Sequence, residues 1–246
     1  AEVTQHKKTR FLMGINPLDF EWLLEKGESF TCPEVVMVHS DEGIGKMSRA
    51  FHDLYRNNLI RGEYKDKRRP ILINNWEATY FNFDTDKLID IAREASKLGI
   101  EMLVMDDGWF GDKYPRNNDH SSLGDWVVNK RKLPNGVDGL IATAKKHGIK
   151  FGIWIEPESA NTVSELYEKH PDWVLKVPNR DPRYGRGGTQ MLLDLSNPEV
   201  QDFVFQVVDD LMTNYPDIAY IKWDANASLV NYGSPYLPKD KQSHIY

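Results

Sequence analysis

The sequence has 246 residues, of which 40% are hydrophobic, 28% are charged and 11% are aromatic, and its net charge is −6; these values indicate a folded globular chain long enough for a sizeable core. No apolar run reaches the roughly 18 residues of a membrane span, and the acidic balance has no basic stripe, so neither a membrane nor a nucleic acid is the expected partner. Cys32 is the only cysteine, which excludes an intramolecular disulfide framework and a Cys-rich metal cluster, and which favours the cytoplasm without establishing it.

The first 69 residues differ in character from the rest of the chain. Short apolar runs bounded by turn signals predict strands over residues 10–14 and 34–38. Apolar residues at helical spacing predict a helix over residues 45–61. The charged stretch 65–70 ends in a proline, and we interpret it as a surface linker and a domain boundary. Two domains, residues 1–69 and 70–246, are therefore expected.

Strand, loop and helix alternate through the remainder of the chain. Each predicted strand is a short apolar run, and each predicted helix has an apolar face, with a glycine or proline near one end. Such alternation favours a parallel sheet with crossover helices. The predicted strands cover residues 71–73, 100–105, 151–155 and 218–223, and the predicted helices cover residues 85–98, 139–147, 161–172 and 198–214.

Two of the helix-to-strand junctions are close copies of each other. Residues 97–100 read KLGI and residues 146–149 read KHGI, and each leads from a helix into an apolar strand that ends in acidic residues. This repetition predicts the α/β class and favours a (β/α)8 TIM-type barrel, with its active groups at the C-terminal strand ends. A doubly wound sheet stays open as an alternative, although no Gly-rich phosphate fingerprint follows any strand.

Acidic and aromatic side chains stand at the C-terminal ends of the predicted strands. A single acid in a loop is more often a solvated cap, but acids at three consecutive strand ends, interleaved with tryptophans, point to a shared site. Carboxylates can each accept two sugar hydroxyls and tryptophan can cover the apolar face of a sugar ring, so this set favours a neutral polyol over a phosphate. In chain order the residues are Trp76, Asp106, Asp107, Trp154, Glu156, Glu158, Lys222, Asp224 and Asn226.

Residue types alone leave three functions open. Glycoside hydrolysis would use one carboxylate as nucleophile and a second, about 5–5.5 Å away in a retaining enzyme, as acid/base. Non-catalytic sugar binding would need the same side chains. Lys222, two residues before Asp224, disfavours a metal ion on Asp224, because the ammonium would repel the ion. The ammonium instead keeps the Asp224 carboxylate ionised. A Mg²⁺-dependent barrel enzyme would draw its ligands from Asp106, Asp107, Glu156 and Glu158.

Six stretches of the chain carry a resemblance to a known family. They are residues 73–81 (INNWEATYF), 106–111 (DDGWFG), 121–126 (SSLGDW), 154–158 (WIEPE), 170–175 (HPDWVL) and 220–224 (YIKWD). In this combination they are highly specific. Residues 40–43 (SDEG) and 48–52 (SRAFH) also match, so the resemblance covers almost the whole chain. The chain resembles the α-galactosidases, or melibiases, of glycoside hydrolase family 36.

The resemblance implies a retaining exo-glycosidase that hydrolyses terminal α-galactosides of the melibiose and raffinose type. It implies neither a cofactor nor a metal, and it implies a homo-oligomer, in this family often a tetramer. An α-N-acetylgalactosaminidase or an α-galactosyl transferase of the same family stays open as an alternative. The implied nucleophile is Asp224, and the implied substrate-binding residues are Trp76, Asp106, Asp107, Trp154, Arg186, Lys222 and Asn226.

The chain also departs from the family pattern. It has only four strand–helix units, whereas a complete barrel takes about 250 residues, so we expect the first half of a barrel with two open strand edges. Residues 1–69 resemble the end of the β-sandwich domain that precedes the barrel, and the acid/base is expected beyond Tyr246, in a protein about three times longer. Residues 113–120 look expanded, residues 185–190 (GRGGTQ) contain extra residues around Arg186, and Ser159 stands where the family tends to have methionine.

Overall fold

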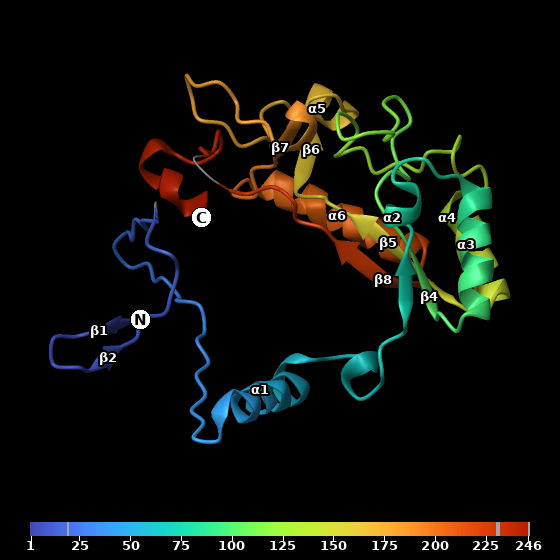
Figure 1. The fold of residues 1–246 in the computed structure, drawn as a ribbon. Helices are drawn as coiled ribbons and strands as arrows, with labels where there is room; N and C mark the ends of the chain where they lie inside the picture. The colour runs from blue at the N-terminus through green and yellow to red at the C-terminus, as the bar shows by residue number, and fades with distance from the viewer. Residues whose placement is uncertain (19, 230–231, 246) are drawn as a thin grey trace. The chain divides into compact units, whose positions relative to one another are not determined.

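The computed structural model describes residues 1–18, 20–229 and 232–245. It divides into two compact units, residues 1–69 and residues 70–246 (Figure 1). Within the described residues, no helix is long and apolar enough to cross a membrane.

The first unit contains little regular structure. An antiparallel pair joins β1 (Glu2–Val3) to β2 (Thr9–Arg10), and one amphipathic helix, α1 (Gly43–Leu54), continues into a single π-helical turn. The predicted helix is therefore confirmed. The strands predicted over residues 10–14 and 34–38 are wrong, because only Arg10 of these two ranges lies in a strand. Most of their apolar side chains are exposed, and among the residues of this unit that the structure describes no partner strand or packing layer holds them in a sheet.

The second unit is built on a four-stranded parallel sheet. Its strands are β3 (Leu72–Asn74), β4 (Met102–Met105), β5 (Lys150–Ile155) and β8 (Ile218–Trp223), and they neighbour one another in chain order (Figure 1). The predicted α/β class with a parallel sheet is confirmed. Because the order never reverses, this sheet has no topological switch point of the kind where doubly wound folds bind their ligands.

The helices of this unit begin and end at the local signals in the sequence. Helix α3 (Thr85–Lys97) is capped by Asp84, whose carboxylate accepts a hydrogen bond of 2.9 Å from the Lys87 backbone N–H. The two similar junctions end their helices in the same way, since Gly99 and Gly148 follow them at φ +78° and +72°. The other long helices are α4 (Gly136–Lys146) and α6 (Pro198–Asn214), which is capped by Asn197 and has proline in its first turn.

One predicted helix is largely wrong. Over residues 161–172 the chain forms only a short helix, α5 (Glu165–Lys169), capped by Ser164. Just before it, β6 (Ser159–Asn161) pairs antiparallel with β7 (Gln190–Leu192), and the sequence analysis missed this pair. The β6–β7 pair lies beyond the C-terminal ends of β5 and β8 (Figure 1) and brings the loop before Gln190 to that end of the sheet.

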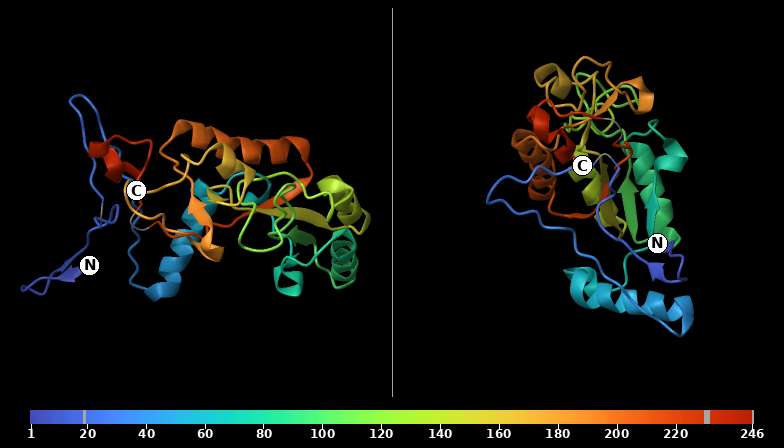
Figure 2. Two further views of the ribbon diagram at one scale, coloured as in Figure 1. Left: turned by 90° about the horizontal axis from the view of Figure 1, so that it is seen from above. Right: turned by 90° about the vertical axis from the view of Figure 1, so that its left-hand side faces the viewer.

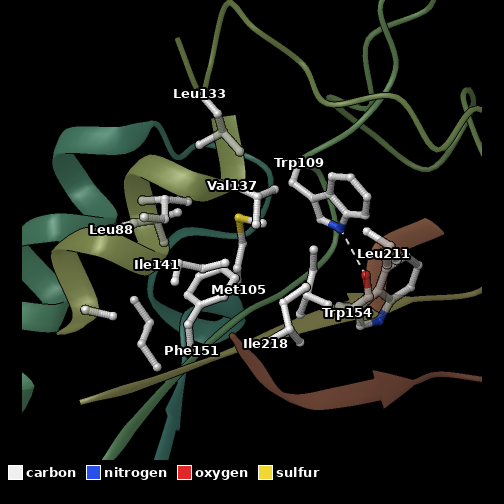
Figure 3. Close-up of a cluster of buried hydrophobic side chains, with 14 of the residues drawn as sticks. Leu88, Met105, Trp109, Leu133, Val137, Ile141, Phe151, Trp154, Leu211 and Ile218 are labelled. Carbon is white, nitrogen blue, oxygen red and sulfur yellow. Dashed lines mark hydrogen bonds between the residues drawn. The ribbon is translucent and has the colours of Figure 1, made fainter. Parts of the chain in front are cut away.

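The main core lies between the sheet and its helices. Helices α3 and α4 pack against each other. Helix α6 runs alongside β5 in Figure 1 and in the left-hand view of Figure 2. The Trp109 indole N–H donates a hydrogen bond of 2.9 Å to the Trp154 carbonyl, which ties the loop after β4 to β5 (Figure 3). The buried side chains of this core include Leu88, Met105, Trp109, Leu133, Val137, Ile141, Phe151, Trp154, Leu211 and Ile218.

The outer strands β3 and β8 each have one unpaired edge in the described part of the chain. Large apolar side chains on these strands are exposed, among them Leu72 at 43% and Trp223 at 49%. An open parallel edge beside exposed apolar side chains is a surface that further structure normally covers.

Candidate active site

Strand alternation and register place three of the predicted residues in one row. Lys222 pairs with Trp154 across β5 and β8, and the β4–β5 register brings Asp106 beside Trp154. Because side chains alternate between the two faces of a strand, these three lie on the same face, and Asp224, two residues after Lys222, follows on that face. The sheet alone therefore directs two carboxylates, an ammonium and an indole to the same place.

Asp224 is held by donors from two strands. The Trp154 indole N–H donates a hydrogen bond of 3.0 Å to Asp224 Oδ2, and Lys222 Nζ lies 3.7 Å from the same oxygen. The Asp224 backbone N–H donates to the Ile155 carbonyl at 2.9 Å, which fixes the main chain just past the end of β8. Burial raises the pKa of Asp224, but Trp154, Asn226 and the Lys222 charge outweigh it and hold this pKa below its usual range. Asp224 is thus an ionised carboxylate at neutral pH.

Asp106 is buried beside Asp224 and shares Lys222 with it. Its Oδ2 accepts hydrogen bonds from Lys222 Nζ at 2.8 Å and from the Asn74 side-chain amide at 2.5 Å. Its Oδ1 accepts the backbone N–H of Asp107 at 2.9 Å. Lys222 therefore bridges two carboxylates, and its charge offsets the repulsion between them.

Asp107 is bound by an arginine that the sequence analysis missed. The Arg116 guanidinium donates to both carboxylate oxygens of Asp107, with N–O distances of 2.8 to 3.2 Å, and Arg116 is only 1% exposed. Burial raises the pKa of Asp107, and Arg116 opposes that rise. The same guanidinium donates to the Ser121 carbonyl and the Asn161 side chain. A single arginine in a polar loop carries no local signal that it is buried, so only the three-dimensional pairing reveals this role.

Lys132 joins the loops that follow β3 and β4. Its amine donates hydrogen bonds of 2.8, 2.9 and 3.2 Å to the carbonyls of Phe81, Gly108 and Arg116. Burial lowers the pKa of Lys132 to about 8. The amine thus connects the main chain next to Asp107 with the segment that follows Trp76.

The two glutamates of the WIEPE stretch accept hydrogen bonds from different donors. Glu156 is buried, and its carboxylate accepts a hydrogen bond of 2.7 Å from the Asn226 amide and another from the Gln190 amide. Glu158 accepts a hydrogen bond of 2.7 Å from the Trp223 indole. Among the described residues, no three His, Cys, Asp or Glu side chains are arranged to hold a metal ion. This arrangement gives no support to the Mg²⁺ alternative.

The buried Glu156 carboxyl makes stability depend on pH. Burial raises its pKa to about 7, so the folded state binds this proton more tightly than the unfolded state, in which the pKa is about 4.3. The contribution to the free energy of unfolding is therefore full below about pH 4.3 and is lost as the pH rises through 7, by up to about 4 kcal/mol. We expect Glu156→Gln to flatten the pH dependence of unfolding between pH 4.5 and 7.5, measured in urea.

The exposed Glu199 of α6 supplies the control, since Glu199→Gln should leave this pH profile as in the wild type. A Glu156→Gln profile as steep as that of the wild type would contradict the assignment.

The predicted tryptophans and arginine contribute to this group in different ways. Trp76 begins α2 (Trp76–Thr79), and its backbone N–H donates to the Asn74 side chain, which also binds Asp106. Trp154 is 1% exposed with Phe110 stacked parallel to it, so in this structure it presents its N–H to Asp224 rather than an open ring face. Arg186 lies in the loop before β7, and its charge acts on Asp224.

The chain resembles known proteins along nearly its whole length. The family model described as Melibiase matches residues 29–246. α-Galactosidase AgaA from Geobacillus stearothermophilus is 52% identical over 241 residues, which are 98% of this chain and 32% of AgaA. The crystal structure of an AgaA variant in complex with raffinose superposes with a TM-score of 0.88 at 51% identity, over 95% of this chain and 32% of that one. The α-galactosidase from Lactobacillus brevis gives a TM-score of 0.92 at 40% identity, over 99% of this chain and 32% of its own.

The chain spans about a third of the length of the curated relatives that it matches. The matched region contains every residue of the site described above, from Asn74 to Asn226. On this evidence, the chain belongs to the melibiase family.

Proposed function

We propose that this chain carries the nucleophile and much of the galactose site of a retaining α-galactosidase that acts on terminal α-galactosides of the raffinose type. The observation that supports this most strongly is the geometry around Asp224. An ionised carboxylate is fixed by Trp154 and Lys222 beside a second carboxylate, Asp106, at the C-terminal edge of a parallel sheet. A nucleophilic carboxylate needs this kind of fixed, charged state, and the relatives named above are α-galactosidases.

In the proposed first step, Asp224 attacks the anomeric carbon of the galactosyl group. The bond from that carbon to the leaving oxygen breaks, and a second carboxyl group protonates this oxygen. A covalent galactosyl–enzyme results, and the same second group then removes a proton from the water that hydrolyses it. The charges of Asp224 and Asp106 would stabilise the positive charge that develops on the sugar in both transition states.

The substrate-binding roles follow from the positions of the side chains. Asp106 and Asp107 offer carboxylate oxygens to sugar hydroxyls, and their orientation is supported by Lys222 and Arg116. Lys222 can also donate to a hydroxyl, because an ammonium has three donors. Asn226, Trp76, Trp154 and Arg186 complete the proposed galactose site.

We also propose that the sheet is the first half of a (β/α)8 barrel. The four parallel strands in chain order, the unpaired edges of β3 and β8, and relatives about three times as long all support this. Four further strand–helix units would close the ring and supply the acid/base, while residues 1–69 would be the end of a preceding β-sandwich domain. On this view the 246 residues alone are catalytically incomplete.

The test is the stereochemistry of hydrolysis by the full-length protein. With raffinose as substrate, ¹H NMR should show α-galactose as the first product, followed by slow mutarotation, because two successive inversions retain the configuration. The isolated 246-residue chain should give no measurable turnover. Release of β-galactose first, or no galactose release from the full-length protein, would disprove the proposal.

A further inference from the structure

The two loops that depart from the family pattern, residues 113–120 and residues 185–190, lie against each other; we call them the loop pair. His120 Nδ1 and the Gly187 carbonyl oxygen are 2.6 Å apart. The Thr189 hydroxyl donates a hydrogen bond of 2.8 Å to the His120 carbonyl. Loops separated by about 70 residues in sequence are thus joined by two polar contacts.

The close approach of the loop pair depends on Gly187. This residue has φ +65°, and a Cβ there would lie 2.5 Å from the Asp119 carbonyl oxygen. Only glycine tolerates both the conformation and the contact. Asn161 on β6 adds a third tie, because its amide donates to the Asp119 carbonyl at 3.2 Å and to the Thr189 hydroxyl at 2.9 Å. The contacts within the loop pair therefore end on main-chain carbonyls of both loops.

The Asp119 carboxylate lies between two guanidinium groups. Its Oδ1 is 3.6 Å from Arg116 Nη2 and 3.7 Å from Arg186 Nη1. This oxygen is buried and accepts no hydrogen bond within the described structure. The two arginines differ, because Arg116 is fixed by its bonds to Asp107, whereas the Arg186 side chain is 47% exposed. The Asp119 carboxylate thus lies within ion-pair distance of one fixed and one partly exposed guanidinium.

Arg186 in turn is connected to the region of Asp224. Burial raises the pKa of Asp224, and the charge of Arg186 is among the contributions that outweigh this rise. The Arg186 backbone N–H donates to the Gln190 side chain, whose amide donates to Glu156. The charge of Arg186 thus acts on Asp224, and its main chain is linked through Gln190 to Glu156.

We propose that Asp119 is a positioning residue that directs Arg186 toward the substrate, and that the loop pair holds this arrangement. The inference rests on the proposed function, in which Arg186 binds the galactosyl group. A flexible arginine binds a neutral hydroxyl weakly unless its direction is fixed beforehand, and a carboxylate behind the guanidinium fixes it. In this inference Asp119 acts through Arg186. Its 3.6 Å contact with Arg116 is the competing route, which would show as a loss that persists when Arg186 is already replaced.

The test is a double-mutant cycle in the full-length enzyme with 4-nitrophenyl α-galactoside. Asp119→Asn, which keeps the size of the side chain, should lower kcat/KM by about tenfold, a loss typical of residues coupled in one charged network. Most of this loss should appear in KM. Arg186→Met should lower kcat/KM further, and the double variant should be no worse than Arg186→Met alone, because Asp119 then has nothing to direct. Gly187→Ala, which separates the loop pair, should reproduce the effect of Asp119→Asn.

Asp112→Asn is the matched control, because Asp112 precedes the same loop, is 76% exposed and lies 3.7 Å from Arg131. It should leave kcat/KM unchanged. An unchanged kcat/KM in Asp119→Asn would overturn this inference, and so would a double variant whose loss is the product of the two single losses. Normal turnover by the wild-type enzyme would leave the proposed function standing in either case. If Asp119→Asn does not fold, Gly187→Ala combined with Arg186→Met decides by the same criterion. A wild-type enzyme without α-galactosidase activity would overturn both.

Discussion

Asp224→Asn in the full-length enzyme should lower kcat for an aryl α-galactoside by at least about 10⁴-fold, the loss typical when a residue of a covalent catalytic unit is removed. The amide keeps the size of the side chain and can still accept the Trp154 hydrogen bond, but it is not a nucleophile. Binding of 1-deoxygalactonojirimycin should change far less than kcat. Single-turnover kinetics and a binding titration measure the two effects separately.

Asp217→Asn provides the control for this substitution. Asp217 directly precedes β8, at the opposite end of the strand, and its exposed carboxylate pairs with Lys145. Exposed ion pairs contribute little, so turnover should stay at the wild-type level. If Asp224→Asn retained normal turnover, the nucleophile would lie elsewhere and the proposed role of Asp224 would be wrong.

The second large effect is expected at Arg116. Arg116→Met should lower the free energy of unfolding by about 3–5 kcal/mol, because it leaves the buried Asp107 carboxylate without its partner. Urea unfolding followed through the near-UV circular dichroism of the buried tryptophans measures this loss. Adding Asp107→Asn should recover part of the stability, since the unpaired charge is then removed, but not the activity.

Arg131→Met is the matched control for Arg116→Met. Arg131 follows in the same connection between β4 and α4, but its side chain is 71% exposed. Its loss should change the free energy of unfolding by no more than about 0.5 kcal/mol. Equal destabilisation by the two substitutions would show that the Asp107–Arg116 pair has no special role in stability.

The parts of the fold that were predictable are those with local causes. The cap at Asp84 and the glycines at 99 and 148 fix helix boundaries within a few residues, and buried strands such as β5 read as continuous apolar runs. The row of Asp106, Lys222 and Asp224 follows from the same logic, since parallel strands bring their C-terminal ends together. This part of the site needed only the strand positions.

The parts that failed depend on contacts between distant segments. The β6–β7 pair joins two three-residue segments, too short to show a strand pattern, that pair across a long connection and bury Ala160 and Met191 together. Residues 34–38 have strand-like composition but pair with no strand in the described part of the chain, so composition alone gave a wrong prediction. Arg116 and Asp119 stand in a loop whose sequence shows no periodicity, and their roles appear only when the loop folds back onto Asp107 and Arg186.

The most direct test of the role of Asp224 is covalent trapping. A fluorinated α-galactosyl fluoride, which forms the galactosyl–enzyme but slows its hydrolysis, should label the full-length enzyme once, and peptide mass spectrometry should place the sugar on Asp224. A label on another carboxylate, or turnover without any covalent species, would contradict the account.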